Sequence, residues 1–126
     1  MSKPSAQPDP RSFLPLTPLA LHVLLALAER PLHGYGIIQE VAARTDGLIG
    51  LRSGTLYTLL QRLQGLRLIR ESGERPAAEE DDERRRYYEL TPLGRAVLEA
   101  DLRRLEAAVL EGRHKRIVRS PSKERA

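Results

Sequence analysis

A run of small, hydroxylic and basic residues near the middle of the chain could bind an oxyanion. Ser53, Gly54 and Thr55 open a segment with helical leucine periodicity, so their backbone amides and short side chains can approach a phosphate closely. On the side opposite the leucines, hydroxyl and guanidinium groups follow that could contact phosphates or base edges. The candidate nucleic-acid contacts of this segment are Arg52, Ser53, Gly54, Thr55, Tyr57, Thr58 and Arg62.

Each of these side chains also has a purely structural interpretation. Tyr57 contacts nucleic acid or packs its ring against the hairpin that follows, and Ser53 caps the helix whether or not it also donates to a phosphate. Arg52 and Arg62 bind phosphates or are solvated charges. Tyr35, further upstream, reaches a DNA backbone or packs against the helix that begins near Ser53. The sequence leaves these alternatives open.

Basic residues also flank a run of five consecutive acids, Glu79–Glu83. Arg75 precedes the acids, and Arg84–Arg86 follow them directly. These arginines either bind phosphates or pair with the neighbouring carboxylates. We expect Arg75 and Arg86 to face nucleic acid and the acids to point into solvent, because like charges repel a phosphate backbone.

The residue types argue against catalysis and metal binding. The chain has no cysteine, which excludes disulfides, thiolate zinc sites and a cysteine nucleophile. Its histidines, His22, His33 and His114, fall on different expected elements and lack a ligand spacing. The sequence has no nucleophile elbow and no phosphate-binding glycine loop. We therefore expect no enzyme, no cofactor and no metal.

The charge of the chain is unevenly distributed. Its 126 residues carry a formal net charge of +4, but residues 1–111 carry −1 and residues 112–126 carry +5. An argument for DNA binding therefore has to rest on local arrangement. The longest apolar stretch, Leu19–Ala28, has about half the length of a membrane span, and the polar N-terminus lacks a signal core. We expect a cytoplasmic protein of one domain that does not enter a membrane.

Periodicity and turn residues predict the elements that position the candidate contacts. We expect a disordered leader over 1–15, a helix over 18–29 that starts at Thr17-Pro18, and a second helix over 33–45 that ends at Asp46-Gly47. A third helix follows Ser53. Strand-like segments cover 68–74 and 84–90, a final helix covers 92–112, and a loose basic tail covers 113–126.

The first and last helices carry more apolar surface than a domain of this size can cover. The helix over 18–29 is apolar nearly all round, and the last helix repeats apolar residues at spacings of four, three and four. We therefore expect a homodimer. The predicted interface residues are Leu19, Val23, Leu27, Leu98, Leu102, Leu105 and Val109.

The order helix, helix, helix, hairpin, helix is that of a winged helix-turn-helix with an added helix. The fold class predicted is mainly α with a small β-hairpin. It comprises a DNA-binding winged helix-turn-helix over 16–91 and a C-terminal dimerisation helix over 92–112.

Five motifs follow one another along the chain, namely Leu32-His33-Gly34-Tyr35-Gly36-Ile37, Gly54-Thr55-Leu56-Tyr57, Arg62-Leu63, Leu68-Ile69 and Arg85-Arg86-Tyr87-Tyr88-Glu89-Leu90-Thr91-Pro92-Leu93-Gly94-Arg95. In this order they resemble the motifs of the PadR family of transcriptional regulators, and the resemblance runs from Leu16 to about Leu110. The resemblance implies a dimer, usually a repressor, that associates through its first and last helices, in the short form with one C-terminal helix.

The chain departs from the family pattern at Arg67, where the family usually has a glycine. Arginine in a left-handed cap costs roughly 1 kcal/mol, so we expect the third helix to end earlier, at Gly65. Two functions fit the sequence. The first is a regulator that binds an inverted-repeat operator in double-stranded DNA, and the alternative is a winged-helix module that binds protein instead. With neither Trp nor Cys, the chain gives no indication of a small-molecule effector.

Overall fold

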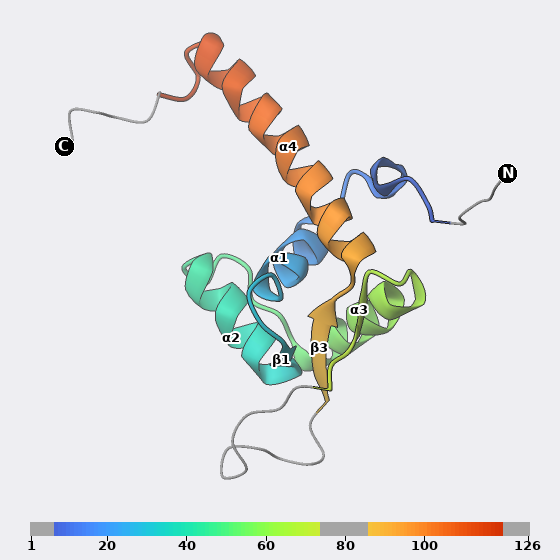
Figure 1. The fold of residues 1–126 in the computed structure, drawn as a ribbon. Coiled ribbons are helices and arrows are strands. Elements are labelled where there is room, and N and C mark those ends of the chain that lie inside the picture. The colour runs from blue at the N-terminus through green and yellow to red at the C-terminus, as the bar shows by residue number, and fades with distance from the viewer. Residues whose placement is uncertain (1–6, 74–85, 120–126) are drawn as a thin grey trace, which may run out of the picture.

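The computed structural model describes residues 7–73 and 86–119. Figure 1 shows a body of short helices packed around a small sheet, with one long helix extending away from it. In chain order the elements are a 3-10 helix η1 (Pro10–Phe13), α1 (Pro18–Ala26), β1 (Leu32–His33), α2 (Gly34–Arg44), α3 (Ser53–Gly65), β2 (Ile69–Glu71), β3 (Tyr87–Leu90) and α4 (Pro92–His114).

Threonine-proline pairs start α1 and α4, as the sequence predicts. The Thr17 hydroxyl accepts a hydrogen bond from the amide of Ala20 at 3.1 Å, and the Thr91 hydroxyl accepts one from the amide of Gly94 at 2.9 Å. In both helices the proline stands in the first turn, where its missing N–H costs nothing.

The start of α3 differs from the prediction. Arg52 is the N-cap residue, with an extended backbone at φ −90° and ψ 152°, and no side chain caps the helix. The prediction that Ser53 caps α3 is wrong, because Ser53 is already the first helical residue. The first amides of α3 therefore receive no capping hydrogen bond from the side chain of Arg52.

The end of α3 combines the two possibilities raised by the sequence. Gly65 is the last helical residue, as predicted, yet Arg67 still adopts the left-handed conformation, with φ 66°. The amide of Arg67 donates to the carbonyl of Gln64 at 2.9 Å, and the amide of Leu68 donates to the carbonyl of Leu63 at 3.0 Å. This pair of bonds is a Schellman cap, whose geometry requires a left-handed residue at the position of Arg67.

Three short strands form an antiparallel sheet in the order β1-β3-β2. The hairpin of β2 and β3, called the wing below, pairs Ile69 with Leu90 and Glu71 with Tyr88. Its predicted ends at 74 and 84 lie outside the described residues. Sequence analysis missed β1, in which Leu32 pairs with Tyr88, because two residues are too few to show a strand period. The predicted fold class, mainly helical with a small antiparallel hairpin, is confirmed.

One apolar core joins α1, α2, α3, the wing and the first half of α4. Val23, Leu27 and Leu98 expose only 0%, 2% and 4% of their surface within a single chain. The prediction that these three side chains pack against a second subunit is wrong, since their own chain already covers them. Leu19 is partly buried and lies at the edge of the core.

The N-terminal segment is more structured than predicted. Asp9 caps η1 by accepting a hydrogen bond from the amide of Arg11 at 2.9 Å, and η1 packs against α4. The expectation of a disordered leader over 1–15 is therefore wrong for residues 10–13. No periodic signal marks this segment, because a single 3-10 turn is too short to produce one.

The end of α4 also differs from the prediction, since the helix continues two residues further. Arg116 takes a left-handed φ of 65°, and the amide of Ile117 donates to the carbonyl of Gly112 at 2.8 Å. The loose tail predicted over 113–126 is therefore wrong for residues 113–118, which form the last helical turn and its cap.

The two halves of α4 have different surroundings. The first half packs on the body as far as Asp101, which is fully buried and accepts a hydrogen bond from Nε of Arg104 at 2.7 Å. The second half extends away from the body (Figure 1). It exposes large apolar side chains over its whole length, namely Leu102, Val109 and Leu110.

Candidate nucleic-acid interface

The two faces of α3 have opposite character. Leu56, Leu60 and Leu63 are buried in the core, with exposures of 0%, 1% and 2%. The other face is exposed and carries Tyr57 and Thr58 near its start. Because the leucines already anchor the helix in the core, most of the polar face is available for recognition.

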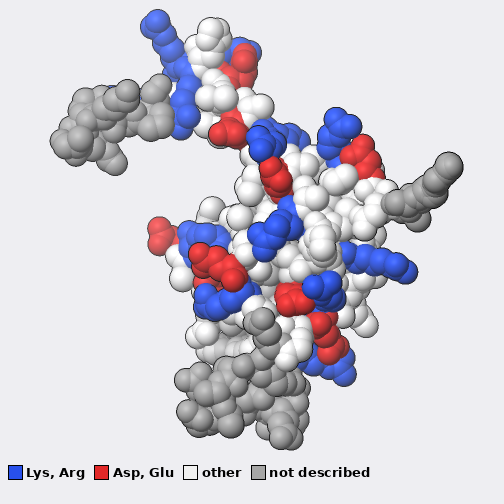
Figure 2. Space-filling model, viewed as in Figure 1, with Lys and Arg blue, Asp and Glu red and all other residues white. Residues whose placement is uncertain are grey.

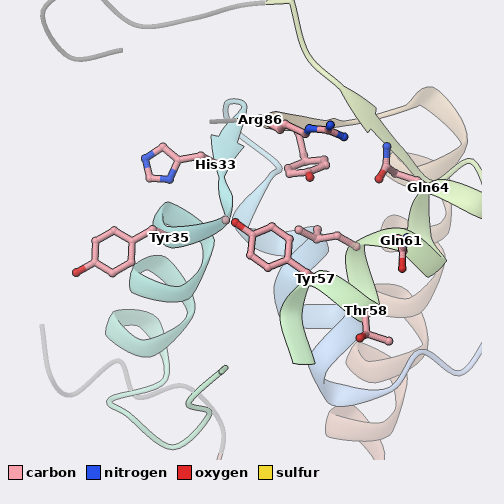
Figure 3. Close-up of a pocket in the computed structure, with 10 residues that line it drawn as sticks. His33, Tyr35, Tyr57, Thr58, Gln61, Gln64 and Arg86 are labelled. Carbon is pink, nitrogen blue, oxygen red and sulfur yellow. The ribbon is translucent and has the colours of Figure 1, made fainter. Parts of the chain in front are cut away.

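Tyr57 reaches across to the start of α2. Its hydroxyl and ring lie so close to Gly34 that a Cβ atom at this glycine would overlap them. Figure 3 shows the phenol extending from α3 toward the first turn of α2. The ring of Tyr57 rests on Gly34, and it also lines one cavity together with Tyr88 of the wing. The side chain remains half exposed.

A polar cavity of about 740 Å³ opens between the start of α2, α3 and the wing. It brings together four of the predicted contacts, which are Tyr35, Tyr57, Thr58 and Arg86 (Figure 3). Its other lining residues are His33, Gly34, Leu60, Gln61, Gln64 and Tyr88.

Gln61 and Gln64 are candidate contacts that sequence analysis missed. Both line the cavity from α3, four and seven residues after the predicted contact Tyr57. The signal was present, because positions four and seven residues after Tyr57 share its face of a helix. A glutamine amide both donates and accepts, which suits it to base edges.

A second groove, of about 450 Å³, runs along the other side of α3, next to the start of α1. It brings together the predicted contacts Gly54, Thr55 and Arg62, and it shares Thr58 with the polar cavity. The predicted residues of α3 therefore divide into two edges of one exposed surface, with Thr58 between them.

Arg52 and Ser53 stand at the start of α3, where both are exposed. They line neither of the two hollows described above. Arg75 and the acids Glu79–Glu83 lie outside the described residues, so the expected arrangement of the wing tip stays a prediction.

The start of α2 is held by a histidine. His33 is its N-cap residue, and Nδ1 accepts a hydrogen bond from the amide of Gly36 at 3.0 Å. The imidazole stacks parallel to Tyr35 at a ring separation of 6.5 Å and meets the edge of Tyr87 at 5.2 Å. His33 thus has a structural role, and Tyr35 projects outward with 60% of its surface exposed.

The described part of the wing balances its basic residues with acids. Nη1 of Arg86 lies 3.2 Å from Oε2 of Glu71, and Nε of Arg70 lies 2.7 Å from Oε2 of Glu89. The hydrogen bond from Arg70 lowers the pKa of Glu89 below its ordinary value. On the face shown in Figure 2, basic and acidic side chains are interspersed rather than gathered into one patch. Local arrangement, not net charge, has to determine binding.

Within residues 7–73 and 86–119, no group of three His, Asp or Glu side chains is placed to hold a metal ion. In the same part of the chain, no helix is both long enough and apolar enough to cross a membrane.

Comparison with known proteins identifies the family. Residues 23–100 match the model of the transcriptional regulator PadR-like family. The chain is 38% identical over 93 residues to the transcriptional regulator Rv3488 of Mycobacterium tuberculosis, covering 72% of this chain and 78% of that protein.

Solved structures agree on the fold. A transcriptional regulator from Clostridium thermocellum has a TM-score of 0.63 at 23% identity, covering 86% of this chain and 93% of that one. Bacillus subtilis PadR in complex with operator DNA has a TM-score of 0.57 at 20% identity, covering 70% and 48%. The chain therefore belongs to the PadR-like family and is a DNA-binding transcriptional regulator with a winged-helix fold.

Proposed function

We propose that this protein is a repressor that binds an inverted-repeat operator as a homodimer, with one α3 helix in the major groove of each half-site. Two such helices would read half-sites about one helical turn apart. The residues assigned to the contact lie on the exposed face of α3 or next to it, namely Tyr35, Arg52, Ser53, Gly54, Thr55, Tyr57, Thr58, Gln61, Arg62, Gln64 and Arg86. Arg75, which lies outside the described residues, is assigned from the sequence alone.

One observation carries the DNA-contact assignment. The exposed face of α3 presents hydroxyl, amide and guanidinium groups between the polar cavity and the groove beside α1. Such groups supply both phosphate contacts and base-edge hydrogen bonds. The similarity in fold to the Bacillus subtilis protein, which was solved in complex with operator DNA, supports DNA binding by this fold.

The dimer is supported by unpaired apolar surface on the second half of α4. Leu102 and Val109 expose 38% and 42% of their surface, although both belong to the apolar repeat of the helix. Leu105 lies between them in the same repeat and is partly buried. With Leu19 of α1, these side chains form the proposed interface, which no longer includes Val23, Leu27 or Leu98. The seam from Leu102 to Val109 is only about one heptad long, so α1 must contribute to the interface.

Repression requires no contact beyond DNA binding itself. A dimer placed across a promoter excludes other proteins from the base pairs that it covers. We assign no effector ligand, and we expect the protein to act in the cytoplasm, where its operator DNA lies.

Selection of duplexes from a random pool tests this function. The wild-type chain should enrich an inverted repeat, and its affinity for the enriched duplex should fall steeply with salt, because phosphate neutralisation releases counterions. Placing that repeat in a promoter should reduce transcription when the protein is added. Failure to enrich any sequence, together with salt-independent association with a protein partner, would instead support a protein-interaction module.

A further inference from the structure

The two ion pairs of the wing occupy opposite faces of the hairpin. Side chains alternate along a strand, so Glu71 shares a face with Tyr88, which stands opposite it, and with Arg86, two residues before Tyr88. Arg70 and Glu89 stand opposite each other one position along, and they therefore belong to the other face. The two pairs have the same chemistry but different surroundings.

The ion pair of Glu71 and Arg86 lies on the face of the wing that is turned toward α3. Arg86 and Tyr88 line the polar cavity together with Tyr57 and Gln64 of α3. Figure 3 shows Arg86 on the wing side of this cavity, near Gln64. Burial is the main cause that raises the pKa of the Tyr88 phenol. The neighbouring Tyr57 and the negative charge of Glu71 raise it further. Arg70 and Glu89 do not line the cavity.

The pair is held loosely enough to open. The side chains of Arg86 and Glu71 are 71% and 50% exposed, and their charged atoms are 3.2 Å apart. Exposed pairs of this kind contribute little to folding stability. A phosphate oxygen could therefore replace the carboxylate on Arg86 without disturbing the hairpin.

We propose that Glu71 is a specificity-determining residue, which neutralises Arg86 until a duplex docks fully against α3. This inference rests on the proposed DNA contact of α3. Non-specific DNA binding comes almost entirely from attraction between basic side chains and phosphates. While Arg86 is paired with Glu71, the pair has no net charge to attract a phosphate, and the carboxylate of Glu71 repels one that comes close. When base contacts fix the register, one phosphate takes the place of Glu71 on Arg86, and the half-exposed carboxylate turns into solvent.

The test compares the affinities of four variants for two DNA probes across a salt series. The variants are Glu71→Gln, Glu89→Gln, Arg86→Gln and the double variant of Glu71 and Arg86. The probes are a mixed-sequence duplex and a duplex that the wild-type chain selects from a random pool. Glu89→Gln is the matched control, because it removes one carboxylate and frees one arginine on the opposite face of the same hairpin.

We expect Glu71→Gln to bind the mixed-sequence duplex about 3- to 10-fold more tightly at low salt, with a log–log salt slope steeper by about one. The gain on the selected duplex should be smaller, so the ratio of the two affinities falls. Glu89→Gln should leave that ratio unchanged. The gain should vanish in the double variant, because it depends on a free Arg86. Thermal unfolding should be nearly the same for all four proteins.

Three results would overturn the role of Glu71. They are equal affinities for wild type and Glu71→Gln, equal gains for Glu71→Gln and Glu89→Gln, and a gain that persists without Arg86. If the wild-type chain selects no duplex at all, the DNA contact of α3 fails first and takes this inference with it. Binding by the wild type with no change in Glu71→Gln refutes the inference alone.

Discussion

The phenol of Tyr57 on α3 lies directly over the Cα atom of Gly34 on α2, with no room for a methyl group between them. This contact fixes where a half-exposed aromatic side chain points on the proposed DNA surface. Because the atoms that would clash belong to the far end of Tyr57, the ring can move aside if the glycine is replaced. Gly34 therefore positions Tyr57 rather than holding the fold together.

Replacing Gly34 by alanine should weaken binding to a selected duplex by up to about 1 to 3 kcal/mol, the usual cost of losing one specific contact. Unfolding by urea should change little, since alanine is at least as favourable as glycine in a helix. Gly36→Ala is the control, because a Cβ there would meet Leu32 and His33 at ordinary distances of 3.5 and 3.6 Å. Additive losses in a double variant with Tyr57→Ala would contradict the positioning role.

Tyr57→Ala and Arg62→Ala should each weaken binding to the selected duplex by about 1 to 3 kcal/mol. Tyr57→Phe separates the contribution of the hydroxyl from that of the ring. Arg103→Ala, on α4, removes the same charge as Arg62→Ala but from outside the α3 surface, and should have little effect. The assignment of α3 fails if both alanine variants keep wild-type affinity in a binding titration while remaining folded.

Replacing Leu102 and Leu105 by glutamate should convert the proposed dimer to monomer in analytical ultracentrifugation. Both residues belong to the part of the helix that leaves the body, so each chain should stay folded by circular dichroism. Leu48→Glu is the control, since Leu48 is 87% exposed and lies between α2 and α3. A doubly substituted protein that remains dimeric at micromolar concentration would refute the proposed interface.

Arg67→Gly should raise the free energy of unfolding by up to about 1 kcal/mol, because glycine adopts the left-handed conformation without steric cost. The larger entropy of glycine in the unfolded chain offsets part of this gain. Arg67→Ala keeps the steric cost and should give no comparable gain in urea denaturation. Equal stabilities for the glycine and alanine variants would show that Arg67 is not strained.

Stability should fall as the pH drops below about 6.5, in part because of His22. Burial, together with the positive charge of Arg44, lowers the pKa of His22, and Nδ1 of this ring is buried with no hydrogen-bond partner among the described residues. A lowered pKa in the folded state means that the unfolded state binds more protons in this range. The contribution of neutral His22 to folding stability is therefore fully present above the ordinary histidine pKa. It is lost as the pH falls toward the lower pKa that His22 has in the folded state.

His22→Gln should flatten this dependence when melting temperatures are measured between pH 7.5 and 5.5. The wild-type protein should lose more thermal stability over that interval than the variant does. Parallel curves for the two proteins would assign the pH dependence to other groups.

The sequence predicts an element well where a local motif specifies its start. It predicts poorly which surface covers a side chain, because tertiary contacts determine that. Thr17 and Thr91 start helices because a threonine before proline specifies a helix start locally. By contrast, Val23 and Leu98 were assigned to a subunit interface because an apolar side chain indicates burial without indicating which surface covers it. Arg67 shows the same limit, since the packing of the Schellman cap overrides the preference of arginine against a left-handed backbone.

The straight second half of α4 has a consequence for the spacing of operator half-sites. From Leu102 to His114 the helix continues for about 20 Å at 1.5 Å per residue. In a dimer that crosses at this segment, the crossing point sets the distance between the two α3 helices. Moving the crossing point by one heptad along α4 shifts each α3 helix by about 10 Å, which is close to the length of three base pairs. Insertions in α4 could thus change which operators fit while every base contact stays the same.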